Sequence, residues 1–116
     1  MMNQTVLVGR IVKDPEVKDL ESGKKVSNIT LAVPRSYKNA EGEYETDFIN
    51  CELWDHIAQN TSDYCKKGDL VGVKGRIQTD SYEVDGEKKY SQKIVVERLT
   101  YLQSKNHEKE NDDLEV

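Results

Sequence analysis

Two large aromatic side chains, Phe48 and Trp54, stand out within the stretch 44–54. Side chains of a β-strand alternate between two faces. Alternation places three small apolar residues on one face, as expected of a core face: Ile49, Cys51 and Leu53. The opposite face carries the two aromatics together with Asn50 and Glu52. Large aromatics exposed on a polar face usually mark a docking surface, and the bases of a single-stranded nucleic acid stack on such rings.

The strand alone leaves a second interpretation open. Phe48 and Trp54 are equally well explained if they pack beneath a covering helix or a partner subunit. The choice depends on the elements that position these rings, and on whether other strands present aromatics in the same way.

Length and composition limit the class of protein. The chain has 116 residues, which fits one domain with a small core. Apolar residues make up 35% and charged residues 34%, a balance that suits a β-barrel or a domain stabilised by oligomerisation. No apolar run has the length of a membrane span. The N-terminus lacks the basic and apolar segments of a signal peptide, so we expect a cytoplasmic protein.

The formal net charge of −5 argues against a simple basic nucleic-acid binder. The distribution of the charge alters this view. Residues 103–116 hold two lysines and five acidic residues, a net charge of −3. Residues 1–102 therefore carry only −2, and this nearly balanced part can form a local basic groove.

Hydrophobic periodicity predicts five strands and one helix. Alternation and β-branched residues indicate strands at 6–12, 26–37, 44–54, 70–82 and 90–102. Apolar and small residues at spacings of three and four indicate a helix at 56–67, with Ile57, Ala58, Thr61, Tyr64 and Cys65 on one side. Asp55 is expected as its N-cap and Gly68 as its C′ residue. Asp85 and Gly86 predict a hairpin turn.

Two of these strands contain residues that disturb a regular ladder. Gly9 predicts a bend or a close backbone approach within strand 6–12. Strand 26–37 has a clear core face: Ile29, Leu31 and Val33. Pro34 follows it and indicates a sheet edge or a bulge. The side on which Tyr37 emerges is therefore not fixed by alternation.

Strand 70–82 presents an aromatic beside basic groups. Its core face is expected to hold Val71, Val73, Gly75 and Ile77. Its outer face is expected to hold Lys74, Arg76, Gln78, Asp80 and Tyr82. Strand 90–102 is apolar on both faces, with Ile94 and Val96 on one and Val95, Leu99 and Tyr101 on the other. We therefore expect it to be covered twice, the second time by a partner chain.

The sequence offers little for metal binding or catalysis. Cys51 and Cys65 form no C-x-x-C motif and are expected to be reduced and buried, so no metal or cofactor is predicted. His56 and His107 have no evident nucleophile to serve. The nearest acidic cluster lies in the polar tail: Asp112, Asp113 and Glu115. A mobile tail cannot preorganise a hydrolytic site, which disfavours an enzyme such as a nuclease.

Five strands with one short helix between strands 3 and 4 define the expected fold class. It is all-β, a five-stranded OB-fold barrel that spans residues 1–102. OB-folds commonly bind oligonucleotides across their open face. Residues 103–116 are polar, charged and aperiodic, and we expect a disordered acidic tail there.

Five segments follow one another in a distinctive order: 7–16 (LVGRIVKDPE), 28–33 (NITLAV), 47–54 (DFINCELW), 64–68 (YCKKG) and 75–79 (GRIQT). On these segments the chain resembles a bacterial or phage single-stranded DNA-binding protein over about residues 2–102. This resemblance implies a protein that binds single-stranded DNA with little sequence preference and protects strands in replication, recombination, repair or DNA uptake.

The resemblance also implies a homotetramer and a set of DNA-contacting residues. Four aromatics match the family's stacking positions: Tyr37, Phe48, Trp54 and Tyr82. This favours the exposed placement of Tyr37. The expected phosphate contacts are Arg35, Lys67, Lys74 and Arg76. Asn50 and Gln78 share the same strand faces and complete the candidate set.

Several residues depart from the family pattern. Asp55, His56 and Asp80 occupy positions where close relatives often carry basic residues, which predicts a weaker and more salt-sensitive grip. Longer members end in an acidic tip with a terminal Pro-Phe that recruits replication and repair proteins. The segment 112–116 (DDLEV) has the acids but not this ending, so recruitment is not expected.

One other function stays open on the sequence. The net acidity and the missing basic residues also suit an OB-fold protein-interaction module of the replication-restart type. Four aromatics at the stacking positions favour DNA binding over that alternative.

Overall fold

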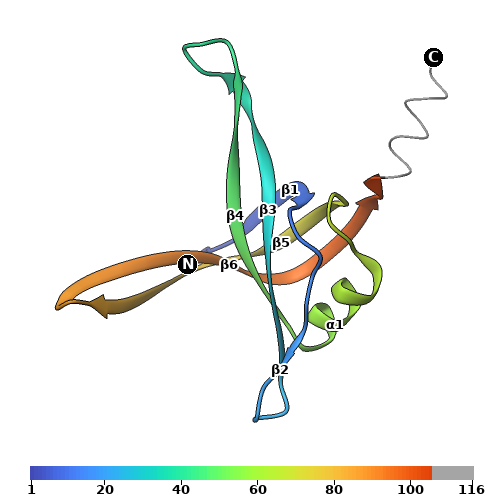
Figure 1. Ribbon diagram of the computed structural model, residues 1–116, viewed down its shortest axis with the longest axis vertical. Helices are drawn as coiled ribbons and strands as arrows, with labels where there is room; N and C mark the ends of the chain where they lie inside the picture. The colour runs from blue at the N-terminus through green and yellow to red at the C-terminus, as the bar shows by residue number, and fades with distance from the viewer. Residues whose placement is uncertain (106–116) are drawn as a thin grey trace.

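The computed structural model describes residues 1–105 and consists of a barrel of long strands with one helix packed beside it (Figure 1). Seven elements follow in chain order: β1 (Thr5–Ile11), β2 (Lys18–Asp19), β3 (Lys25–Lys38), β4 (Tyr44–Trp54), α1 (Asp55–Tyr64), β5 (Leu70–Val84) and β6 (Glu87–Gln103). The five predicted strands and the helix are all present. The two-residue β2 was not predicted, so in this numbering the helix lies between β4 and β5.

The long strands close on themselves. The sheet order is β1-β5-β6-β4-β3-β2, and a further pairing of β1 with β3 joins its ends. Most pairings are antiparallel, whereas β4 and β6 pair in parallel at Cys51–Ile94 and Glu52–Val95. A closed five-stranded barrel with a helix after its third long strand confirms the predicted OB-fold.

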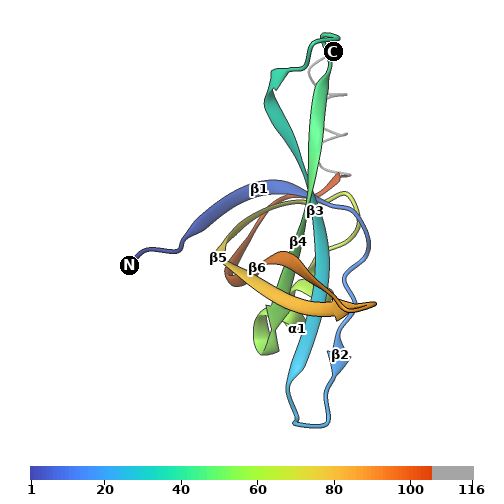
Figure 2. The ribbon, with the colours of Figure 1, turned by 90° about the vertical axis from the view of Figure 1, so that its left-hand side faces the viewer.

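Two long hairpins extend away from the barrel in different directions, β3–β4 and β5–β6 (Figures 1 and 2). The β5–β6 turn is formed by Asp85 and Gly86, with φ values of 52° and 79°. Positive φ at both central residues is the type I′ geometry that matches the twist of the flanking strands. The turn predicted from the Asp-Gly pair is confirmed.

The core fills the barrel and the contact with α1. Its buried members come from every long strand and the helix: Ile11, Ile29, Leu31, Cys51, Leu53, Ala58, Cys65, Val71, Val73, Ile94 and Val96. The predicted core faces of β3 and β4 are confirmed, with Val33 and Ile49 partly buried against this cluster. Ile77 is exposed, contrary to the prediction, because β5 leaves the barrel at that point towards the hairpin.

A β-bulge corrects the predicted faces of β6. Val96 pairs with Gly75 but Arg98 pairs with Lys74, so Glu97 is an extra residue. Such a residue reverses the alternation beyond it. Leu99 consequently packs against the same core as Val96. Val95 is only 8% exposed within one chain, whereas Tyr101 is 46% exposed, so the covering of this strand by a partner chain stays a prediction.

A second irregularity lies where Pro34 predicted one. Pro34 pairs with Thr46, and the next pair along the hairpin is Lys38 with Tyr44. Three residues of β3 therefore face one residue of β4 between these pairs. The bulge interrupts the alternation before Tyr37, which explains why strand parity could not orient this ring.

The ends of α1 differ from the prediction. Asp55 is the first helical residue and not the N-cap, which is Trp54 and makes no side-chain capping bond. Asp55 has a φ of 49°, and its Oδ1 accepts a hydrogen bond from the backbone N–H of Lys25. The helix ends at Tyr64, whose ring is exposed and not on the core side. Gly68 lies in the following turn with a φ of 93°.

Two glycines allow neighbouring backbones to approach closely. A Cβ atom at Gly9 would lie 2.8 Å from the carbonyl oxygen of Ala32, which confirms the close approach predicted there. A Cβ at Gly75 would meet the carbonyl oxygen of Val95 at 2.2 Å. Backbone atoms cannot move aside as a side-chain end can. Gly75 is therefore required where β5 and β6 shift register.

The predicted tail lies almost wholly outside the described residues. β6 continues through Gln103, and the backbone N–H of Lys105 donates to Oδ1 of Asp69. Residues 106–116 are not described, so the prediction for them stays a prediction. Within residues 1–105, no helix has both the length and the apolar character that a membrane span requires.

We expect Gly75→Ala to destabilise the fold by about 1–3 kcal/mol or more, because the added methyl group overpacks a backbone contact. Gly72→Ala on the same strand is the matched control, since its Cβ would meet Leu102 Cδ1 at an ordinary 3.7 Å. Urea unfolding followed by circular dichroism measures both. Equal unfolding midpoints for the two variants would contradict the close approach at Gly75.

Candidate nucleic-acid interface

Strand pairing brings one face of β4, β6 and β5 into a continuous surface. Glu52 pairs with Val95, which pairs with Arg76. Gln78 pairs with Lys93, and Tyr82 with Lys89, further along the β5–β6 hairpin. Because paired residues point to the same side of a sheet, the outer residues of the three strands share one face. Seven of the ten candidates lie on it: Phe48, Asn50, Trp54, Lys74, Arg76, Gln78 and Tyr82.

The aromatic candidates differ in exposure. The side chains of Phe48, Tyr37 and Tyr82 are 66%, 63% and 51% exposed. Trp54 is partly buried. The chain's own helix therefore does not cover Phe48, and the covering-helix interpretation is wrong for that ring. Trp54 lies at the end of β4, in a pocket of about 330 Å³ that Arg76, Gln78 and Val95 also line.

The indole of Trp54 is held by a carboxylate. Its Nε1 donates to Oε1 of Glu52 at 2.7 Å. The other oxygen of Glu52 accepts from Nζ of Lys93 at 2.7 Å, and Lys93 also pairs with Asp80 at 3.0 Å. The hydrogen bonds that Lys93 donates to Glu52 and Asp80 raise the pKa of Lys93. The bond from Lys93 lowers the pKa of Asp80, so the Lys93–Asp80 pair is charged at neutral pH.

The two cations of β5 are placed differently from Lys93. Nη1 of Arg76 donates to Oε1 of Gln78 at 2.9 Å. Neither Lys74 nor Arg76 has a carboxylate within ion-pair distance among residues 1–105. Both side chains are exposed. Their charges are therefore available to an anionic ligand, unlike that of Lys93.

Asn50 lies between the two aromatic positions of β4. Its Oδ1 accepts a hydrogen bond from Oγ1 of Thr30 at 3.3 Å, which leaves the side-chain NH₂ group as a donor towards a ligand. Phe48 and Asn50 also border an opening of about 400 Å³ between β4 and the β5–β6 pair, where Ile77 is exposed.

Arg35 lies in a different environment from the one expected. Its guanidinium donates to both oxygens of Asp47 at 2.9–3.2 Å and also to Glu45. Asp47 and Glu45 alternate with Phe48 on β4, so Arg35 lies on the opposite side of the hairpin. The bonds with Asp47 raise the pKa of Arg35 and lower that of Asp47. Arg35 is therefore already paired with two carboxylates.

Lys67 is not close to the aromatic face. It lies in the loop between α1 and β5, where its backbone N–H donates to Oδ1 of Asp14. Tyr37 lies in the bulged part of β3 near Arg35. The structure therefore brings together the candidates on β4 and β5, but not Arg35, Tyr37 and Lys67.

Two residues that connect to Trp54 through hydrogen bonds were missed or undervalued. Lys93 was not a candidate, and Glu52 was noted only as a member of the outer face. The available signal was parity, since Lys93 is two residues from Val95 and shares its side of the strand. What sequence reasoning lacked was the parallel register that brings β6 beside β4.

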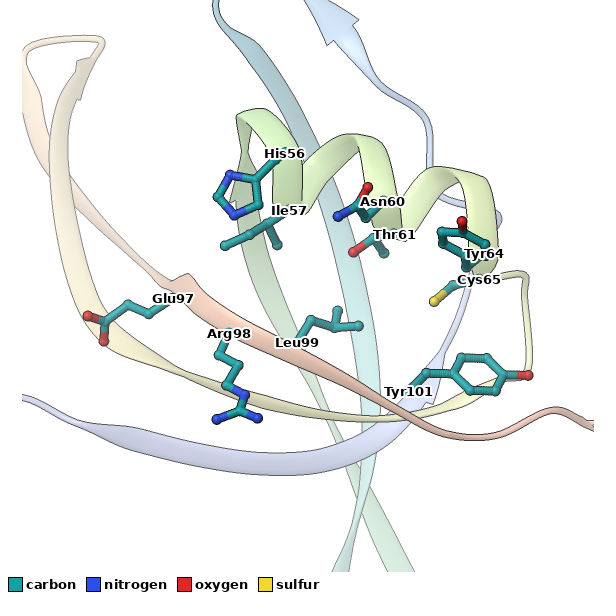
Figure 3. Close-up of a pocket in the computed structure, with 10 residues that line it drawn as sticks. All are labelled: His56, Ile57, Asn60, Thr61, Tyr64, Cys65, Glu97, Arg98, Leu99 and Tyr101. Carbon is teal, nitrogen blue, oxygen red and sulfur yellow. The ribbon is translucent and has the colours of Figure 1, made fainter.

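A larger cavity, of about 660 Å³, lies elsewhere, between α1 and β6 (Figure 3). Its walls include Ile57 and Tyr64 of the helix and Leu99 and Tyr101 of the strand. Cys65 lines it, but burial raises the pKa of this thiol, which disfavours a nucleophilic thiolate. Within residues 1–105, no group of three or more histidine, cysteine or acidic side chains could hold a metal ion. The cavity therefore offers packing surface and no recognisable chemistry.

The barrel and its aromatic face define an OB-fold protein with an open ligand-binding surface, and known proteins narrow the class further. The model of the single-strand binding protein family matches residues 2–102. Single-stranded DNA-binding protein B of Bacillus subtilis is 48% identical over 113 residues, which cover 97% of this chain and 100% of the relative. The chain belongs to the single-strand binding protein family.

Longer relatives match the same part of the chain. Single-stranded DNA-binding protein 3 of Listeria innocua is 48% identical over 108 residues, 92% of this chain and 68% of the relative. Single-stranded DNA-binding protein 1 of Staphylococcus aureus (strain MSSA476) is 43% identical over 115 residues, 98% of this chain and 74% of the relative. The resemblance stated from the sequence is confirmed.

We expect both thiols of the native protein to react slowly with 5,5′-dithiobis(2-nitrobenzoate) at pH 8. Burial raises the pKa of Cys51 from 9.0 to about 11, so about one thousandth of this thiol is ionised at pH 8, and the thiolate is the reacting form. Unfolding restores the ordinary pKa, and both free cysteines should then react rapidly. Rapid reaction of one thiol in the native protein would contradict its burial.

Proposed function

We propose that this protein binds single-stranded DNA without strong sequence preference, as a stoichiometric binder that protects strands during replication, recombination, repair or DNA uptake. The observation that carries the proposal is the row of aromatic rings on an uncovered sheet face, at Phe48, Trp54 and Tyr82. Family membership and relatives named single-stranded DNA-binding proteins support it.

Stacking is the main source of affinity in this proposal. A base that lies on an aromatic ring contributes about 1–3 kcal/mol, judged by alanine substitution. Every base has a π-face, so stacking tolerates any sequence. The proposed stacking rings are Tyr37, Phe48, Trp54 and Tyr82, with Asn50 and Gln78 as hydrogen-bonding neighbours on the same face as three of them.

Phosphate contacts supply a smaller part. Among the proposed cations, Lys74 and Arg76 are exposed and have no carboxylate partner within residues 1–105. Arg35 is engaged by Asp47 and Glu45, so it contacts a phosphate only if one of these ion pairs opens. Lys67 lies on another element and would be reached only by a strand that continues around the barrel.

Two further expectations remain proposals. A homotetramer and a cytoplasmic location fit the family resemblance. Recruitment of other proteins through 112–116 is not proposed, and these residues lie outside the described part of the chain. The replication-restart interaction module is not favoured, since the aromatic face suits a stacked ligand better than a flat protein contact.

The first test is a titration of Trp54 fluorescence. Trp54 is the only tryptophan, so its emission reports one site. We expect oligo-dT to quench it strongly and a duplex of equal length to quench it little, because the bases of a duplex are already stacked on one another. The quenching should weaken as salt increases. Absence of quenching by the single strand at low salt would contradict the proposed function.

The salt dependence should distinguish the two arginines. Loss of one contact with a phosphate of a single strand reduces the slope of log K against log salt by about 0.7. We expect Arg76→Gln to reduce this slope by about that amount and Arg35→Gln to reduce it by less, because carboxylates already neutralise Arg35. Fluorescence polarisation of a labelled oligo-dT at several salt concentrations measures both. Equal reductions would mean that Arg35 exchanges its carboxylates for phosphate.

A further inference from the structure

A chain of hydrogen bonds crosses the aromatic face from Trp54 to Arg76. It runs from the indole N–H to Glu52, then to Lys93, from Lys93 to Asp80, and on through Gln78. These residues lie on β4, β6 and β5, so the bonds connect three strands. Asp80 and Gln78 are linked at 3.4 Å, the longest contact of the series.

The two contacts at Glu52 are the shortest of the series, at 2.7 Å each. One oxygen accepts the indole N–H of Trp54 and the other accepts from Lys93. The side chains of Glu52 and Lys93 are only 15% and 25% exposed, so water competes little for these bonds. A carboxylate held from both sides cannot rotate without breaking one of these bonds, and its bond to Nε1 restrains the orientation of the indole.

A carboxylate on this face is costly if the ligand is a polyanion. The hydrogen-bond chain holds two carboxylates, Glu52 and Asp80, and two cations, Lys93 and Arg76, so its net charge is zero. Each carboxylate cancels attraction that a cation would otherwise offer to a phosphate backbone. A role for Glu52 that offsets this cost must involve a group other than phosphate. The hydrogen bond between Glu52 and Trp54 identifies that group as the indole.

We propose that Glu52 is a positioning residue that holds the ring of Trp54 in its base-stacking orientation, and that Lys93 locks Glu52 and is not a phosphate contact. The inference rests on the proposed function, since it concerns the stacking role of Trp54. In this view, the ion pair of Glu52 and Lys93 holds the stacking surface in place before DNA binds. An indole already fixed in the unbound protein loses less side-chain freedom when a base stacks on it.

The proposal makes opposite predictions for two substitutions that remove the same charge. Glu52→Met removes the acceptor of the indole N–H, so we expect oligo-dT binding to weaken about three- to tenfold, the size of one net hydrogen bond. Asp80→Asn removes an equal charge but leaves Glu52 on the indole and Lys93. We expect it to bind oligo-dT at least as tightly as the unmodified protein, since repulsion falls.

A double-mutant cycle tests whether the effect passes through the indole. Phenylalanine has no N–H, so Glu52→Met in a Trp54→Phe background should not weaken binding. Glu52→Gln keeps an acceptor oxygen and is expected to retain the affinity that Glu52→Met loses. Polarisation of labelled oligo-dT measures all affinities, and thermal unfolding by circular dichroism checks each fold. Glu52→Ala replaces Glu52→Met in the cycle if the methionine variant does not fold, with the same expected signs.

A measurement on the free protein separates this inference from the proposed function. Time-resolved fluorescence anisotropy of Trp54 should show faster local motion in Glu52→Met than in Asp80→Asn. The inference is overturned if Glu52→Met tightens binding as Asp80→Asn does, if it weakens binding equally without the indole, or if the anisotropy decays are the same. Failure of the unmodified protein to bind oligo-dT would instead overturn the proposed function, whatever the anisotropy shows.

Discussion

The short parallel pairing of β4 with β6 is the contact on which both the core and the exposed face depend. Its two residue pairs serve opposite sides of the same sheet: Cys51 with Ile94 faces the core, and Glu52 with Val95 faces outward. Without this register the barrel would stay open between these strands. Trp54 would also lose the neighbours that surround it, because Val95 and Arg76 reach it only through β6.

Much of the fold could be predicted from the sequence because strand signals are local. Alternation identified the core face of β4, and Asp85-Gly86 identified the hairpin turn. The failures at Glu97 and Asp55 involve information from another strand. Glu97 is a bulge where Gly75 of β5 passes close to the backbone of Val95, a contact that the sequence of β6 alone does not reveal. Asp55 resembles an N-cap in the sequence, but its carboxylate is used by Lys25 on β3.

The candidate site shows the same division. Residue type and parity placed Phe48, Trp54 and Arg76 on outer faces, and the structure places those faces side by side. Residue type and parity could not identify the phosphate contacts, because the availability of a cation depends on which carboxylates lie beside it in the fold. The sequence suggested that Arg35 contacts a phosphate, yet the guanidinium group of Arg35 is paired with Asp47 and Glu45. Lys93 matched nothing, yet it stands at the centre of the face.

The paired charges also bear on how an acidic chain can distinguish single strands from duplex. Double-stranded DNA presents mainly phosphates to a protein surface, and cations recognise these without regard to strandedness. Here Lys93 and Arg35 are paired with carboxylates, so neither charge is free to attract a duplex. A single strand adds unstacked bases, which Phe48, Trp54 and Tyr82 can accept. Exposed rings on this face are therefore expected to favour the single strand, because unstacked bases are the groups that a duplex does not offer.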